Sequence, residues 1–464
     1  MKTFKTLSKL AAILFVAITF SSCSNDDDDD PIEFVPSNSI VELAQATPEL
    51  SSLVTALVKY PDLVSLLSND GTFTVFAPNN DAFAALLTAI GQTSIDDIPE
   101  DVLKSVLQHH VFASAALQAS AVTSGTITMA GGETVNVVAD SNGVFLDNAQ
   151  VIAADVLGTN GVVHIINSVL VPPSMLPIVG TIVAPAYFNK NFTTLIAAVL
   201  AADPSILELL LSNGPSNGGL TLFAPTNDAF AAAGITDVNG ADAILAYHVI
   251  DGTVMASMLP ASGIAAAEVA TLGGNIYITN AGGAVSINGT TMVTATDIAG
   301  SNGVVHVIDK TLMPPTNTIN EIVATLSGGS PAEFTLLAAA LSRANLADFF
   351  SGDGPYTVFA PTDAAFLAAG LDEATINATD PMAVAGILTH HVVQPNVYIF
   401  STDLTDGLQA PMLNGQSVTI DLDTLTIQDA AGSTPAAGLV TSLLNVHATN
   451  GVVHVIDKVL LPSS

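Results

Sequence analysis

The chain of 464 residues is longer than one ordinary domain and predicts roughly three domains of ~150 residues each. Its composition, 49% hydrophobic and 11% charged, supplies a core for each domain and excludes a disordered chain. Acidic residues number 42 against 9 Lys and Arg, and the net charge of −33 excludes a nucleic-acid-binding protein, because such a surface repels phosphate. The same charge favours solubility and repels anionic lipid or acidic polysaccharide unless cations intervene.

Residues 1–22 have the pattern of a signal peptide, with lysines at the start and an apolar stretch from Leu10 to Phe20 that is too short to span a bilayer. Two serines then precede Cys23, the only cysteine of the chain. This segment resembles the lipobox of bacterial lipoproteins, in which the cysteine is acylated and becomes the new N-terminus, although that motif prefers Leu where Phe20 stands. We therefore expect lipid attachment at Cys23. An ordinary signal peptide with an incidental cysteine is the alternative.

Residues 23–36 follow as an acidic tether that contains five consecutive aspartates, Asp26 to Asp30. A block of like charge is typical of a solvated, extended segment. Directly after a lipobox it also resembles the acidic export signal of surface-exposed lipoproteins in the Bacteroidota. No apolar run after residue 22 reaches the ~18 residues of a membrane span, so we expect an outer-membrane lipoprotein that is attached through its N-terminal lipid only and faces outward.

Three sequence elements then recur three times in the same order, at a spacing that corresponds to whole domains. We predict domains at 37–173, 178–315 and 318–463, joined by short, stiff spacers at the proline pairs that end the first two. The elements are a Phe-Ala-Pro segment at 74–83, 221–230 and 357–366; a His-His or Tyr-His pair at 108–111, 246–249 and 389–392; and an Asn-Gly-Val-Val-His segment at 160–166, 302–308 and 450–456.

Each copy reads as helices followed by strands, which favours an α+β fold. The first element predicts a strand that ends at Ala77-Pro78, a turn, and a helix capped at Asn79. The Asn-Gly of the last element predicts a tight hairpin turn before a strand. In the first copy the expected helical segments are 49–67, 79–90 and 99–110, and the expected strands are 126–129, 134–138, 143–146, 151–156 and 162–170.

The repeated motifs resemble the two signature segments of the fasciclin domain family, and the resemblance covers about residues 37–464. The Tyr-His pair of that family matches at Tyr247-His248, whereas copies one and three depart from it with two histidines each. The resemblance implies three tandem domains, each a wedge of about seven strands with several helices, and a role in extracellular adhesion. In animal members the Tyr-His region is implicated in integrin binding, a role that the resemblance does not carry to a bacterial protein.

Six histidines form repeated framework pairs among Val and Ile. We expect each to be a core imidazole with both nitrogens hydrogen-bonded, and we keep them as candidate structural or binding residues together with Tyr247. Zinc ligation would need three or four convergent donors, and we argue against it because adjacent histidines in extended chain point to opposite faces. The pairs are His110 with His164, His248 with His306, and His391 with His454.

Other chemical sites find little support in the sequence. No repeated serine comes with a base and an orienting group, and no phosphate-binding loop is present, so we expect no enzyme and no catalytic residue. Asp421 and Asp423 alternate in an expected strand, and we expect no cofactor other than calcium held weakly at the acidic surface. Two functions remain: adhesion through extracellular glycan, matrix or surface-protein ligands, or a non-adhesive structural or accessory lipoprotein of an outer-membrane complex.

Overall fold

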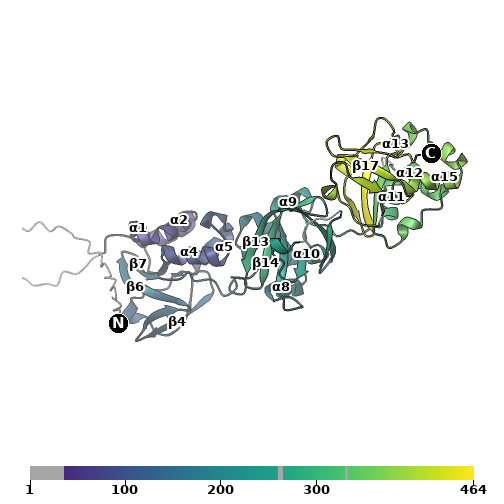
Figure 1. Ribbon diagram of the computed structural model, residues 1–464. Coiled ribbons are helices and arrows are strands. Elements are labelled where there is room, and N and C mark those ends of the chain that lie inside the picture. Colours follow the sequence, from purple (N-terminus) through teal and green to yellow (C-terminus); the bar gives the residue numbers. More distant parts are fainter. Residues whose placement is uncertain (1–35, 260–264, 330–332, 395, 464) are drawn as a thin grey trace, which may run out of the picture.

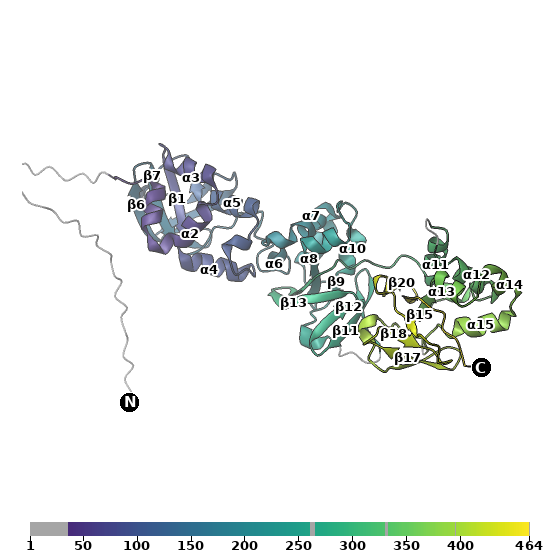
Figure 2. The same cartoon turned by 90° about the horizontal axis from the view of Figure 1, so that it is seen from above.

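The computed structural model describes residues 36–259, 265–329, 333–394 and 396–463, which form three domains in a row (Figures 1 and 2). The predicted signal peptide, Cys23 and all of the acidic tether before residue 36 lie outside the described residues. Within those ranges no single helix is long and apolar enough to cross a membrane. One pair of helical segments, Lys190–Ala201 and Pro204–Leu211, passes that test of length and composition only when taken together across a bend of 119°.

The first domain places its helices before most of its strands. Its predicted helical segment 49–67 is two helices, because Pro61 has no backbone N–H with which to continue the preceding helix. The α-helices are α1 (Ile40–Ala46), α2 (Ser51–Leu57), α3 (Pro61–Ser68), α4 (Asn80–Ala89) and α5 (Glu100–Gln108), and the strands are β1 (Phe73–Pro78), β2 (Val111–Phe112), β3 (Gly125–Thr128), β4 (Thr134–Asp140), β5 (Gly143–Leu146), β6 (Ala149–Gly158) and β7 (Gly161–Ile166).

These seven strands form one sheet in the order β2-β1-β7-β6-β5-β4-β3. The motif strand β1 runs parallel to the last strand, β7, and every other neighbouring pair is antiparallel. The predicted hairpin at Asn160-Gly161 joins β6 to β7. Gly161 has φ +156°, and a Cβ there would lie 2.2 Å from the carbonyl oxygen of Phe73. Only glycine therefore fits at this position, where β7 begins beside β1. The two signature motifs therefore lie side by side, on the second and third strands of the sheet.

The second domain repeats this sheet in the equivalent order, β10-β11-β12-β13-β14-β8-β9, with β14 parallel to β8. Its first helix is short and contains a proline near its start. The helices are α6 (Ala184–Tyr187), α7 (Thr193–Ala201), α8 (Pro204–Leu211), α9 (Asn227–Ala232) and α10 (Asp242–Tyr247), and the strands are β8 (Leu220–Pro225), β9 (Val249–Asp251), β10 (Ala267–Thr271), β11 (Gly274–Ala281), β12 (Ala284–Ile287), β13 (Thr291–Gly300) and β14 (Gly303–Ile308).

The third domain differs from the other two because its seven strands divide into sheets of three and four. The chain that corresponds to the long strand β6 is interrupted here by the short 3-10 helix Thr441–Leu443, and isolated bridges such as Leu439 to Ile456 link the sheets. The helices are α11 (Ile319–Ser327), α12 (Thr335–Arg343), α13 (Asp363–Ala368), α14 (Glu373–Ala378) and α15 (Pro381–Thr389), and the strands are β15 (Tyr356–Pro361), β16 (Gln409–Pro411), β17 (Ser417–Asp421), β18 (Thr426–Gln428), β19 (Ala437–Gly438), β20 (Val446–Ala448) and β21 (Gly451–Ile456).

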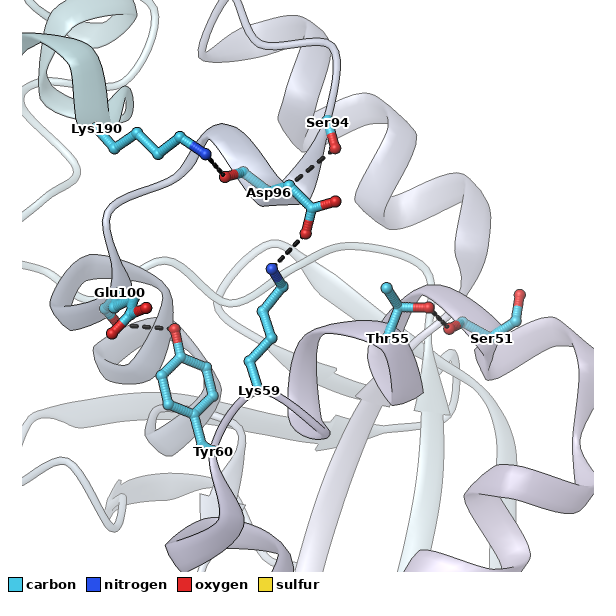
Figure 3. Close-up of polar contacts among 8 residues, drawn as sticks. All are labelled: Ser51, Thr55, Lys59, Tyr60, Ser94, Asp96, Glu100 and Lys190. Carbon is cyan, nitrogen blue, oxygen red and sulfur yellow. Dashed lines mark hydrogen bonds and ion pairs between the residues drawn. The ribbon is translucent and has the colours of Figure 1, made fainter.

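The first two domains pack directly against each other. Gln92 donates a buried 2.9 Å hydrogen bond from Nε2 to the carbonyl of Pro185 and accepts one from Asn189. At the edge of this contact Asp96 pairs with Lys59 of its own domain, while Lys190 of the second domain donates 2.9 Å to the Asp96 carbonyl (Figure 3). One apolar core cluster runs through both domains. Packing as well as the proline spacer therefore fixes this junction.

The second and third domains meet through aromatic rings. Tyr277 on β11 stacks on Tyr398 with ring centroids 4.0 Å apart, and Phe400 packs beside both. Gly289, after β12, has φ +67°, and a Cβ at this position would lie 2.5 Å from the Cβ of Phe400. Asn445 of the third domain donates a 2.9 Å hydrogen bond to the Gly289 carbonyl. The close approach at Gly289 therefore requires the absence of a side chain.

Candidate functional site

The first histidine of each framework pair caps the end of a helix. His110 follows α5, and its Nδ1–H donates 2.7 Å to the carbonyl of Val106, while its Nε2 accepts 2.8 Å from the N–H of Leu170. This pattern requires the neutral ring with its proton on Nδ1. His109 and His110 thus lie at a helix terminus, which corrects our expectation of extended chain at this pair. The same two bonds recur at His248, with Ile244 and Leu312, and at His391, with Ile387 and Leu460.

The second histidine of each pair lies on the last strand and uses the opposite tautomer. His164 donates from Nε2 to the carbonyl of Leu117 at 2.7 Å and accepts at Nδ1 from the N–H of Asp155 at 3.3 Å. Asp155 is the bulged residue of β6 and has φ +60°. The same two bonds recur at His306, with Val254 and Asp297, and at His454, with Ile399 and Asn445.

Each strand histidine also packs on the phenylalanine of the first motif, which stands opposite it on the neighbouring parallel strand. The ring centroids of Phe76 and His164 are 5.5 Å apart. The corresponding distances are 5.6 Å for Phe223 with His306 and 5.7 Å for Phe359 with His454. The two signature motifs are therefore in direct contact, and the histidine of one motif is a packing partner of the other.

Burial keeps four of the six framework rings neutral. Loss of hydration lowers the pKa of His110, His248, His391 and His454 to about 4, although the backbone bond at each ring acts in the opposite direction. A neutral imidazole with both nitrogens in hydrogen bonds has no lone pair left for a metal or a substrate proton. The geometry at the six histidines is therefore that of structural rings within the fold.

The residue before each helix-capping histidine is also buried. Tyr247 is fully buried, donates 2.8 Å to the carbonyl of Asn275 and accepts from Asn288, and burial raises its pKa to about 12. In the third domain His390 bonds Asn414, whereas neither ring nitrogen of His109 has a hydrogen-bond partner. The Tyr-His pair thus lies inside the domain, and a partner could reach it only after local unfolding.

Two further polar positions support this framework, and the sequence interpretation missed both. Asn160 accepts 3.0 Å from the N–H of Ile40 and donates to the carbonyls of Leu67 and Asn69, so it ties the start of α1 and the end of α3 to the hairpin. The same three bonds recur at Asn302 and Asn450. The other position is a buried strand threonine, which donates to one backbone carbonyl and accepts from one N–H of the crossing loop; it is Thr74, Thr221 and Thr357.

The acidic side chains do not gather into a metal centre in the part of the chain that the structure describes, where no group of three or more His, Cys, Asp or Glu is placed to hold an ion. Asp421 ends β17 and accepts 2.9 Å from the N–H of Thr424, and Asp423 lies in the following turn. The expectation that these two carboxylates alternate on one strand is therefore wrong, because the strand ends before Asp423.

Comparison with known proteins agrees with the division of the chain into three domains. Residues 48–172, 190–314 and 332–462 each match the Fasciclin domain family. The chain is 26% identical over 435 residues to periostin of Homo sapiens (92% of this chain, 47% of periostin) and 41% identical over 134 residues to protein sll1483 of Synechocystis (29% of this chain, 73% of that protein). A solved pair of FAS1 domains from the insect cell adhesion molecule Fasciclin I covers 58% of this chain and 96% of that one, with 19% identity and a TM-score of 0.28.

The chain belongs to the fasciclin domain family and carries three copies of its domain, as the sequence motifs predict. This chain spans about half the length of the curated relatives that match nearly all of it. Its α+β domains, with a strand wedge and several helices, are those expected from the resemblance.

Proposed function

We propose that the chain is a cell-surface lipoprotein that mediates adhesion, with three fasciclin domains that contact glycan, matrix or protein ligands together. The observation that carries this proposal is the row of three family domains with a packed junction at each end of the second domain. Weak binding sites on three linked domains bind one surface at the same time, and this linkage raises the avidity by about 10²–10⁴ relative to a single site. Because the framework histidine rings are buried and hydrogen-bonded to the backbone, we expect partners to bind the outer faces of the domains.

The same observations support a binding rather than an enzymatic role. Catalysis by a general base needs a side chain with a free lone pair within reach of substrate. The six framework histidines use both nitrogens in the fold. The acidic surface supports ligands reached through divalent cations, since carboxylates prefer such hard ions.

Adhesion is tested with beads that carry the full chain at graded density. We expect adhesion to cells or glycan surfaces in calcium or magnesium, a reduction by chelator, and a steep rise with density because several contacts must form together. Because one apolar core runs through the first two domains, the full chain rather than a single domain is the unit to test. Adhesion that rises only in proportion to density would contradict the multivalent mechanism.

The anchor has its own test. Cys23→Ser is expected to release the protein from the membrane and abolish fatty-acid labelling, and wild-type protein is expected to be removed from intact cells by added protease. A tether of about 14 residues reaches up to ~50 Å when extended, enough to hold the first domain clear of the bilayer. A Cys23→Ser protein that stays in the membrane with its label would contradict lipid attachment.

A second candidate is a structural or accessory lipoprotein of an outer-membrane complex. It is favoured by the extent of packing between domains, which suits a spacer of fixed shape. Crosslinking in intact cells followed by purification separates the two functions. A stoichiometric outer-membrane partner together with no adhesion to any surface would support the accessory role.

A further inference from the structure

The first domain contains an apolar cavity that is larger than the corresponding spaces in its two sister domains. The cavity has a volume of about 100 Å³ and lies between helices α1, α2 and α3, the end of α5 and strand β1. The corresponding spaces in the second and third domains are about 20 Å³ each. Its wall is almost entirely aliphatic, including Val41, Leu53, Leu57 and Val75. An apolar cavity of this kind stays empty of water and accepts apolar ligands.

One position at the rim of the cavity carries alanine in the first domain and leucine in both sister domains. Ala130, in the turn after β3, lines the cavity and donates 2.7 Å to the carbonyl of Val111. The residues that make the same backbone bond in the other domains are Leu272, to Val249, and Leu413, to Val392. Alanine lacks the three outer carbons of leucine, so the rim of the cavity is less covered in the first domain than in the third, where Leu413 packs against the core; Leu272 of the second domain is 38% exposed.

The cavity reaches the surface at this turn. Ala130 is exposed, Leu66 at the end of α3 is 42% exposed, and Gln108 is half-buried, while the other walls are in the core. The rim therefore has one polar side chain, the amide of Gln108, beside an apolar interior. Such a site, a largely apolar hollow with a polar group at its edge, fits a ligand with an apolar tail and a polar head.

The size of the cavity and the charge around it limit the class of ligand that can bind. An engineered cavity of about 150 Å³ holds benzene, and a volume near 100 Å³ is tighter for a ring than for a narrow chain, which enters through the rim and leaves its head outside. Glu133 ends the turn that carries Ala130, and the chain as a whole is strongly acidic. An anionic head is therefore disfavoured relative to an uncharged one.

We propose that the first domain binds the end of an unbranched hydrocarbon chain in this cavity, with an uncharged polar head at the rim beside Gln108. The site is independent of adhesion, and it distinguishes the domain nearest the predicted anchor from the two beyond it.

The test uses the full chain with Cys23→Ser, so that no attached lipid competes, and 1-octanol as the probe. Calorimetry and methyl NMR are expected to show one octanol site. Octanol is also expected to raise the temperature at which the first domain melts. Octanoate, which has the same tail and a charged head, is expected to bind at least tenfold more weakly. Benzene is the probe for a ring, and equal or tighter binding of benzene would overturn the choice of a chain.

Two variants make the result decisive. Ala130→Leu installs the residue of the sister domains and is expected to weaken octanol binding at least tenfold while the protein melts no earlier. Leu272→Ala is the matched control, because Leu272 is 38% exposed and does not line the space of about 20 Å³ in the second domain, and it is expected to leave octanol binding unchanged. Unchanged octanol affinity in a folded Ala130→Leu protein, or methyl shifts outside the first domain, would overturn the proposal.

Discussion

Thr279 of the second domain donates a 2.6 Å hydrogen bond to the carboxylate of Asp403 in the third domain, and both residues are buried. Asp403 also accepts 2.8 Å from the N–H of Phe400. Burial raises the pKa of Asp403, and the bonds from Thr279 and Phe400 oppose that rise. The N–H of Ala266 in the second domain also bonds this carboxylate, so the stability of the junction depends on the packing of both domains.

Thr279→Val should therefore loosen the junction between the second and third domains. Valine keeps the shape of threonine but removes the donor, and leaving the carboxylate under-bonded costs about 1–3 kcal/mol. We expect a broader distribution of interdomain distances in small-angle scattering or spin-label measurements. Thr441→Val, an exposed change in the third domain, is the matched control. A distance distribution identical to that of wild type would contradict a role for this bond.

Asn302 offers a sharper test of the repeated framework. Asn302→Asp is nearly isosteric, but a carboxylate cannot donate to the carbonyls of Leu210 and Ser212, which the amide now bonds at 2.8 and 2.6 Å. Each buried group left unsatisfied costs about 1–3 kcal/mol, so we expect the second domain to lose roughly 2–5 kcal/mol of unfolding free energy. Urea denaturation measures the loss. The exposed Asn191→Asp controls for the added charge and should change stability by less than about 0.5 kcal/mol.

The sequence predicts the parts of this architecture that local signals determine. The Ala-Pro ending of β1, the helix after it and the hairpin before β7 follow from proline, capping and Asn-Gly chemistry within a few residues. The role of Asn160 does not, because Asn-Gly indicates a turn whether or not the amide reaches helix ends about 90 and 120 residues earlier in the chain.

The domain junctions and the cavity were missed for the same reason. Tyr277 and Gly289 lie outside the repeated motifs, and their importance depends on a neighbouring domain. Ala130 gains meaning only beside Leu272 and Leu413, once shared backbone bonds show that the three positions correspond. The sequence places Asp423 wrongly because Asp-Leu-Asp alternates polar and apolar residues in a strand and in a turn alike, and three residues are too few to distinguish the two.

His306→Ala tests the structural reading of the strand histidines. Removing the ring leaves the carbonyl of Val254 and the N–H of Asp297 without partners and opens a space beside Phe223. We expect a loss of about 1–3 kcal/mol, measured as earlier melting of the second domain. Elemental analysis of wild type and variant should find no stoichiometric metal. Zinc in the wild type that disappears in the variant would show that the ring is a ligand.

The buried histidines also predict how stability depends on pH. The pKa of His110, His248, His391 and His454 is lowered to about 4 in the folded protein, against about 6.5 in the unfolded chain. Between these values the unfolded state binds more protons, so stability is fully present above about pH 6.5 and is lost as the pH falls towards 4.

Each such ring contributes a slope of about 1.4 kcal/mol per pH unit in that window, shared among the domains that contain them. Urea denaturation at pH 7.5, 6, 5 and 4.5 measures it domain by domain. Replacing His110 with Gln is the companion variant, because an uncharged side chain that no longer titrates should flatten the profile of the first domain while lowering its stability at pH 7.5. Equal stability of the wild type at pH 7.5 and 5 would mean that these rings take up protons without opening the fold, and that their backbone bonds are weaker than the geometry indicates.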